Sequence, residues 1–173
     1  MRIYVASSWR NDYQPRVVEA LREANHQVYD FRKPSRVFGG FSWKQTLENA
    51  LESQREPPWF FETYLKALSH PIAARGYAMD ITMLESADAC IFVHPAGRSA
   101  SFELGYAVAK GKKCLVYIPE FEKVEPELMF SDCAFAPSED AMLTWAYIQH
   151  IRIGLDTTAV SPPKNLESVR RVP

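Results

Sequence analysis

Glu103 stands in a stretch whose residue types could support chemistry on a bound ligand. Residues 94–119, HPAGRSASFELGYAVAKGKKCLVYIP, predict the end of a strand, a loop, a helix at about 100–110 and the next strand. Glu103 would then lie in the first helical turn, at the edge of a parallel sheet where α/β proteins keep their ligands. A carboxylate at this place is either a charge that stabilises the helix dipole or a catalytic group.

The spacing around Glu103 does not fit a capping box. That motif needs Ser or Thr three residues before the glutamate, but position 100 is Ala, while Ser99 and Ser101 lie four and two residues before it. A favourable interaction with the helix dipole stays possible. The same dipole would also favour an ionised carboxylate, as a nucleophile requires. Gly105 would let a ligand or another backbone approach closely.

A second carboxylate, Asp80, lies midway along a predicted helix at about 72–86. Aspartate is a weak helix former and has no capping task in the middle of a helix. Two acids, one nucleophilic and one able to hold a proton, are the minimum equipment for cleaving a bond at an anomeric carbon. Asp88 opens the following strand at its amino end, away from that edge, and is expected to be structural.

Two serine-bearing loops precede helices and predict a site for an anion. One is ASSWRND after the first strand, and the other is HPAGRSAS, which also carries Arg98. Neither GxGxxG nor GxxxxGK[ST] is present, so dinucleotide and Walker-type binding are not indicated, and neither a cofactor nor a metal ion is expected. The expected substrate-binding residues are Ser7, Ser8, Trp9, Asp30, His94, Gly97, Arg98, Ser99 and Ser101.

The order of elements predicts an α/β fold, a flavodoxin-like (Rossmann-like), doubly wound, five-stranded parallel sheet. Strands are expected at about 2–6, 26–29, 89–93, 113–118 and 132–136, and helices at about 12–24, 72–86, 100–110 and 138–150. Gly111 is the expected C-cap of the third of these helices.

One domain, residues 1–155, is expected, with a helical, aromatic-rich insertion at about 36–71 and a flexible tail at 156–173. Within the insertion, Ser42 can cap a helix that begins at Trp43. Pro57-Pro58 can start another helix that stops before Pro71.

Charge and cysteine content limit the partners and the compartment. The chain has 20 basic and 21 acidic side chains, a net charge of −1 and no block of like charge, which disfavours nucleic acid and membrane surfaces. Three cysteines, an odd number, with two of them in apolar strands, are typical of small buried residues in a reducing compartment. A cytoplasmic protein without a signal peptide, acting on a small molecule, is expected.

The segment YAMDITMLESADACIFVHPAGRSASFELGYAVAKGKKCLVYIP, with PELMFSD beyond it, resembles the nucleoside 2-deoxyribosyltransferase family. The superfamily also includes the nucleoside 5′-monophosphate N-glycosidases. The likeness covers roughly residues 1–6 and 77–133, and the aromatic insertion is this chain's own. The resemblance implies that Glu103 is the nucleophile on the sugar C1′ and that Asp80 assists proton transfer to the base.

Two departures from the resembled transferases bear on the substrate. They carry an Asp six residues before the glutamate, in contact with the sugar hydroxyls, where this chain has Gly97. They also lend an Asn to the neighbouring active site from the segment where Glu127 and Met129 stand here. Ser99 and Ser101, in place of an acidic loop, resemble the nucleotide hydrolases more. The resemblance further implies a homodimer or a larger even-numbered homo-oligomer.

The resulting hypothesis is an N-glycosidase or deoxyribosyltransferase that cleaves the N-glycosidic bond of a nucleotide or nucleoside through a glutamate nucleophile. Two alternatives remain open. One is a TIR-like NAD glycohydrolase, since TIR domains share a similar sheet and a catalytic glutamate. The other is a non-catalytic nucleotide-binding sensor on the same scaffold, which the changes at Gly97 and Glu127 would permit.

Overall fold

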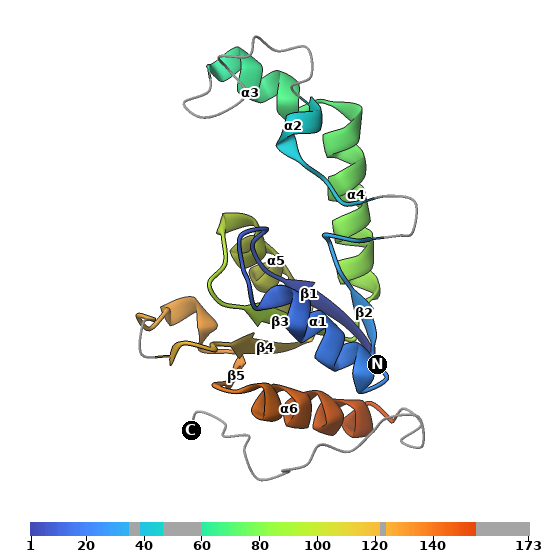
Figure 1. Ribbon diagram of the computed structural model, residues 1–173, viewed down its shortest axis with the longest axis vertical. Coiled ribbons are helices and arrows are strands. Elements are labelled where there is room, and N and C mark those ends of the chain that lie inside the picture. Colours follow the sequence, from blue (N-terminus) through green and yellow to red (C-terminus); the bar gives the residue numbers. More distant parts are fainter. Residues whose placement is uncertain (35–38, 47–59, 122–123, 155–173) are drawn as a thin grey trace. The chain divides into compact units, whose positions relative to one another are not determined.

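The computed structural model describes residues 1–34, 39–46, 60–121 and 124–154. The chain divides into two compact units (Figure 1). The first contains Met1–Asp30 and the described residues from Leu84 onward, and the second is Phe31–Met83. The predicted insertion at 36–71 falls inside the second unit, while the predicted tail at 156–173 lies outside the described residues.

The first unit is built on a five-stranded parallel sheet with strand order β2-β1-β3-β4-β5, which confirms the flavodoxin-like prediction (Figure 1). The strands are β1 (Arg2–Ala6), β2 (Gln27–Tyr29), β3 (Ala89–Val93), β4 (Lys113–Tyr117) and β5 (Ala134–Ala136). All strands run the same way, so their carboxyl ends lie at one edge.

Helices cover both faces of this sheet because its central strands are apolar on both sides. All five residues of β3 are buried. Alternate side chains of the sheet pack with α1 (Gln14–Glu23) and α6 (Glu139–Arg152) in one core cluster. α5 (Arg98–Ala109) packs against β1, β3 and β4 and buries Ala100, Leu104 and Ala107, which are spaced four and three residues apart along one helical face.

Three described helices, α1, α5 and α6, are followed by a left-handed residue whose N–H bonds one of the last carbonyl groups; for α6 this residue is Gly154, which bonds the Ile151 carbonyl. Gly111 follows α5 with φ of 68°, and its N–H bonds the Val108 carbonyl while Lys112 N–H bonds that of Ala107. This is a Schellman motif, and it confirms the predicted termination at Gly111. Asn25, with φ of 63°, ends α1 in the same way.

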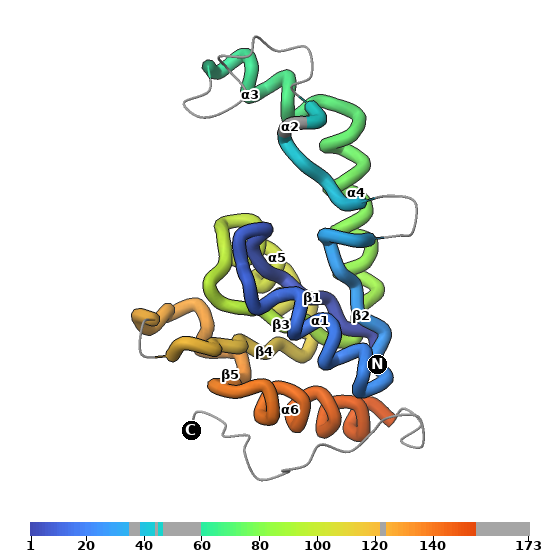
Figure 2. The backbone as a smooth tube through the Cα atoms, viewed as in Figure 1, coloured from blue at the N-terminus to red at the C-terminus, as the bar shows by residue number. Residues whose placement is uncertain are grey.

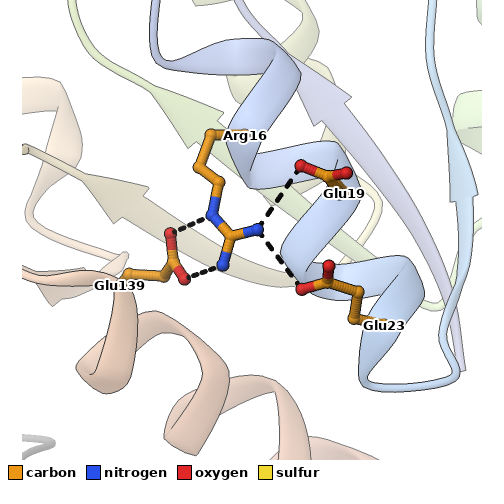
Figure 3. Close-up of polar contacts among 4 residues, drawn as sticks. All are labelled: Arg16, Glu19, Glu23 and Glu139. Carbon is orange, nitrogen blue, oxygen red and sulfur yellow. Dashed lines mark hydrogen bonds and ion pairs between the residues drawn. The ribbon is translucent and has the colours of Figure 1, made fainter.

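Arg16 on α1 connects that helix to the start of α6 (Figure 3). Its Nε and Nη2 bond the two carboxylate oxygens of Glu139 at 3.0 and 2.7 Å, and Nη1 lies 3.4 and 3.3 Å from Glu19 and Glu23. These carboxylates raise the pKa of Arg16, Glu139 most strongly. The bidentate geometry fixes the register between two helices that cover the same face of the sheet.

The second unit contains α2 (Trp43–Thr46), α3 (Phe61–Leu68) and most of α4 (Pro71–Ser86), traced in Figure 2. α2 begins at Trp43, as predicted, and Gln45 Oε1 accepts a hydrogen bond from the Ser42 N–H at 3.0 Å, which is one half of a capping box. The predicted helix start at Pro57-Pro58 lies outside the described residues.

His26 predicts an acid-dependent loss of stability. Its side chain is buried, and neither ring nitrogen has a hydrogen-bond partner in the described part of the chain. Burial first, then the positive charges of the Met1 amino group and His150, lower the pKa of His26 from 6.5 to about 4. The His150 ring lies 5.7 Å from the His26 ring, and its Nδ1 lies 3.1 Å from the Met1 nitrogen.

Between pH 6.5 and about 4, His26 is protonated in the unfolded chain and neutral in the folded chain. Stability from this group is therefore present above pH 6.5 and is lost as the pH falls, by at most about 1.4 kcal/mol per pH unit. Urea denaturation at several pH values should show this slope, and His26→Gln should flatten it. Parallel slopes for both proteins would contradict the assignment.

Candidate active site

Loops that follow different strands are bonded together at the carboxyl edge of the sheet. Ser7 Oγ, directly after β1, donates to the Val93 carbonyl at the end of β3 at 3.0 Å. The loop after β4 is joined to the start of α1, because the Tyr13 hydroxyl donates to the Glu120 carboxylate. The residues predicted on separate loops are thereby held at one edge of the first unit.

The α5 helix begins at Arg98, two residues earlier than predicted, and this moves Glu103 out of the first helical turn. The prediction of a first-turn position was therefore wrong. Gly97 is the N-cap, with an extended backbone, and its carbonyl accepts bonds from Ser101 N–H at 3.1 Å and Ser101 Oγ at 3.3 Å. Dipole stabilisation falls off beyond the first turn, so it explains Glu103 less well than expected.

Glu103 is half-buried, and its carboxylate acts on the sheet beneath α5. Burial first, and the negative charge of Glu103 second, raise the pKa of the Cys90 thiol in β3. Glu103 belongs to α5, the helix that packs against this strand. A carboxylate there, on the second turn of a helix that starts at the ligand edge, can be presented to a bound molecule.

Glu127 lies near His94 of the same chain. Burial lowers the pKa of His94, and the negative charge of Glu127 opposes that shift. Glu127 is exposed and precedes the short 3₁₀ turn η3 (Leu128–Phe130). Leu128 and Met129 are each 83% exposed, which leaves two large apolar side chains on the surface beside Glu127.

The first turn of α5 exposes the groups expected to meet an anion. Arg98 and Ser99 are exposed, and the N–H groups of residues 98–100 precede that of Ser101, the first N–H of the helix that donates to an intrahelical carbonyl, that of Gly97. No described side chain caps this helix. Ser101 instead turns its hydroxyl back to the Gly97 carbonyl. The helix N-terminus, Arg98 and Ser99 together form the more electropositive part of this edge.

Side chains in the loop after β1 make hydrogen bonds within the protein, although the sequence predicted that this loop binds an anion. Ser8 Oγ accepts a hydrogen bond from the Arg10 N–H at 3.1 Å, which stabilises a local turn. Trp9, beside it, is 51% exposed. Asn11, a residue that sequence reasoning did not single out, is buried and bonds both the end of β3 and the start of α1. Its position three residues before the first helical residue, Gln14, was the available signal.

Asp30 stands at the carboxyl end of β2 and is buried. The Gln14 Nε2 donates to Asp30 Oδ1 at 2.9 Å, while Gln14 Oε1 is buried without a hydrogen-bond partner among the described residues. Like Asn11, Gln14 was not predicted from the sequence to belong to the site. The pair places an oriented carboxylate at the same edge as the serine-bearing loops, two strands away from β3.

Asp88, just before β3, and Asp80, within α4, differ in their surroundings. Asp88 accepts hydrogen bonds from the Arg2 N–H at 2.7 Å and Arg2 Nη2 at 3.0 Å, at the amino edge, as a structural residue would. Burial alone would raise the pKa of Asp88, but the bonds from Arg2 outweigh burial and lower it. Asp80 lies midway along α4, as predicted, is half-buried, and belongs to the second unit.

The three cysteines are free and buried, as predicted. Cys90 and Cys114 are register partners in β3 and β4, and the Cys114 thiol donates to the Lys112 carbonyl at 3.5 Å. Across the described ranges, no group of three or more His, Cys, Asp or Glu side chains could hold a metal ion. Nor does any helix described here have the length and apolarity needed to cross a bilayer.

The fold and this edge define an α/β protein with a flavodoxin-like sheet and a carboxylate near its central strand. Over residues 3–166 the chain matches the family described as nucleoside 2-deoxyribosyltransferase. The chain therefore belongs to the nucleoside 2-deoxyribosyltransferase family, enzymes of glycosyl transfer on nucleosides, which confirms the resemblance seen in the sequence.

A solved structure of a 2-deoxyribosyltransferase from the psychrotolerant bacterium Bacillus psychrosaccharolyticus is similar at 20% identity. The match covers 95% of this chain and 100% of that one, with a TM-score of 0.48. At these values it adds nothing to the family assignment. No curated relative matches the chain.

Proposed function

We propose that this protein cleaves the N-glycosidic bond of a nucleoside 5′-monophosphate, with Glu103 as the nucleophile. The observation that carries the proposal is the place of Glu103, half-buried near β3 and outside the first turn of α5, in a member of this family. A half-buried carboxylate on the second turn of a helix that packs against the central strand can act as a nucleophile.

The proposed reaction proceeds in two steps through a covalent intermediate. A Glu103 carboxylate oxygen attacks C1′, the C1′–N bond breaks with its electron pair moving to the base, and Asp80 donates the proton that the base takes up. Water, or a second base with an N–H group, then attacks C1′ and gives its proton to the Asp80 carboxylate, while the C1′–O bond to Glu103 breaks and its electron pair returns to Glu103. The outcome is hydrolysis with water and base exchange with a second base.

The 5′-phosphate is proposed to bind at the first turn of α5. Arg98 and Ser99 are exposed there beside the N–H groups of the first helical turn, which precede the first intrahelical donor, Ser101 N–H. Ser7 and Ser8 border this place from the loop after β1, although Ser7 Oγ is already bonded to Val93 and Ser8 Oγ to Arg10. Hydroxyl and guanidinium groups tolerate a phosphate that a carboxylate would repel.

The rest of the proposed substrate site lies along the same edge. Trp9 is half-exposed and offers a flat surface on which a base could stack. Asp30, held by Gln14, is a candidate for the sugar hydroxyls, which Gly97 cannot bond through a side chain. His94 borders the site from the end of β3.

A nucleotide-binding sensor is the second candidate function, and the observation that favours it is Gly97. A carboxylate contact present in the resembled transferases is missing at this position. A protein of this kind would bind the nucleotide and release no base. The first experiment is therefore incubation with nucleosides, nucleoside 5′-monophosphates and NAD, followed by chromatography for free base.

The two carboxylates should respond differently to the leaving group. Glu103→Gln removes the nucleophile and should abolish base release from every substrate. Asp80→Asn removes the acid and should slow release of a natural base by roughly 10²-fold, while a 4-nitrophenyl 2-deoxyriboside, which leaves as a stable anion, should react nearly normally. Glu19→Gln, an exposed change on α1, is the matched control.

Turnover by Glu103→Gln at the rate of the unchanged protein would remove Glu103 from the mechanism. An equal loss for both leaving groups in Asp80→Asn would remove Asp80 from the role of acid.

Nucleoside 5′-monophosphates should be better substrates than the matching nucleosides, and Arg98→Ala should raise KM for the monophosphates alone by about tenfold or more. Gly97→Asp should reverse the preference, because a Cβ at position 97 meets no atom within 4 Å and a carboxylate there would repel the phosphate. Lys110→Ala removes a cation at the other end of α5 and is the control. Equal kcat/KM for both substrate classes would refute the phosphate site.

We propose further that the active site is completed by a second subunit, in a homodimer or a larger even-numbered oligomer. Glu127 and the exposed Leu128 and Met129 are the proposed contribution of the neighbour. Glu127 also lies near His94 of its own chain, so the experiment must separate the two possibilities.

Mixing two inactive variants, Glu103→Gln and Glu127→Ala, should restore activity if Glu127 acts on the neighbour's site, because one site of each mixed dimer then has both residues. Light scattering should report an even-numbered oligomer. An active monomer, or a mixture that never recovers, would overturn the shared site.

A further inference from the structure

The Asn11 side chain uses both of its hydrogen-bond donors and its acceptor oxygen twice, and it is 1% exposed. Its Nδ2 donates to the Val93 carbonyl at 2.9 Å and to the Pro95 carbonyl at 2.8 Å. Its Oδ1 accepts from the N–H groups of Tyr13 at 2.8 Å and Gln14 at 3.1 Å. Carbonyl groups on one side and N–H groups on the other fix the orientation of the amide.

These bonds join two segments that lie 82 residues apart or more in the sequence. On one side are the first residues of α1. On the other is the loop that leaves β3 at Val93, passes through Pro95 and reaches Gly97, the N-cap of α5. The direction of that loop determines where α5 begins, and therefore where Arg98 and Glu103 are presented.

We infer that Asn11 is a positioning residue for the site at the start of α5. This inference rests on the proposed function, because it assigns to Asn11 the placing of the groups that would bind phosphate and attack C1′. Asn11 contacts neither the substrate nor the reacting atoms. It holds the Val93–Pro95 backbone against α1 so that the first turn of α5 keeps one position before the substrate arrives.

Few other side chains could make the same set of bonds. Aspartate has no donor and would set a charge against the carbonyl oxygens of Val93 and Pro95. Serine could still accept a bond at the start of α1, where it is a good capping residue, but it cannot reach both carbonyls. Asn11→Ser should therefore remove the bonds to the loop after β3 while a bond to the start of α1 is kept.

The experiment compares Asn11→Ser and Asn11→Asp with Asp88→Asn. The control changes a side chain bonded to Arg2 at the opposite edge of the sheet, next to the amino end of β3. For each protein, thermal unfolding, amide hydrogen exchange of residues 94–101, and kcat and KM for nucleoside 5′-monophosphates are measured. Asp88→Asn should lower the unfolding temperature without changing exchange in that segment or either kinetic constant.

Asn11→Ser should accelerate exchange in residues 94–101 by about tenfold or more and lower kcat/KM by roughly 10- to 100-fold, as expected for displaced catalytic groups. Asn11→Asp should do so more strongly. Unchanged exchange in this segment, or faster exchange with unchanged kcat/KM, would overturn the inference, even if stability falls. If Asn11→Asp does not fold, Asn11→Ser alone decides the question.

The same data distinguish this inference from the proposed function. If the unchanged protein releases no base from any substrate, the proposed function fails. Exchange in residues 94–101 and the calorimetric affinity for a nucleoside 5′-monophosphate then test Asn11. Faster exchange together with weaker affinity in Asn11→Ser supports its positioning role, and either quantity left unchanged refutes it.

Discussion

The parallel pairing of β1 with β3 is the constraint on which the rest of the first unit depends. Ile3 pairs with Ala89 and Ala6 with Phe92, so the chain returns over eighty residues later to the strand with which it began. Because the two strands are parallel, the loops that leave them emerge at the same edge. Ser7 and Asn11 can bond the Val93 carbonyl only because this register places them there.

The apolar elements of the fold were readily predicted, because burial on both faces leaves strong patterns. The residues Ala89–Val93 read as a buried strand and are one, and the turn at Gly111 was recognised from its residue type. The start of α5 was not predicted correctly, because no side chain caps it. Its N-cap is Gly97, whose contribution is a backbone carbonyl, and a carbonyl has no sequence signature.

The candidate site residues could be singled out from the sequence, whereas the hydrogen bonds that hold them could not. Glu103 and the serines were singled out from spacing, whereas Asn11 and Gln14 were not, because their partners are backbone groups and a residue on another strand. Hydrogen bonds of this kind depend on tertiary structure, which a local pattern does not contain. The sequence correctly predicted that Asp80 lies within a helix. The spacing of residues within that helix does not predict which residues from other elements lie close to Asp80.

The charged groups at the two edges of the sheet differ in how they are neutralised. At the amino edge Asp88 is paired with Arg2, and burial beside two other basic groups keeps His26 uncharged. At the carboxyl edge the negative charge of Glu127 acts on His94, and Glu103 lies on the second turn of α5, the helix that starts from this edge.

Negative charge gathered in this way would repel an anionic substrate unless a positive region lay beside it. The start of α5 supplies that region, through Arg98 and the helix N-terminus. In the proposed function, a nucleotide lying along this edge has its phosphate at the beginning of the helix and its anomeric carbon one turn further on, at Glu103. The position of Glu103 on the second turn is compatible with that proposal, because the first turn then carries Arg98 and the N–H groups proposed to bind the phosphate.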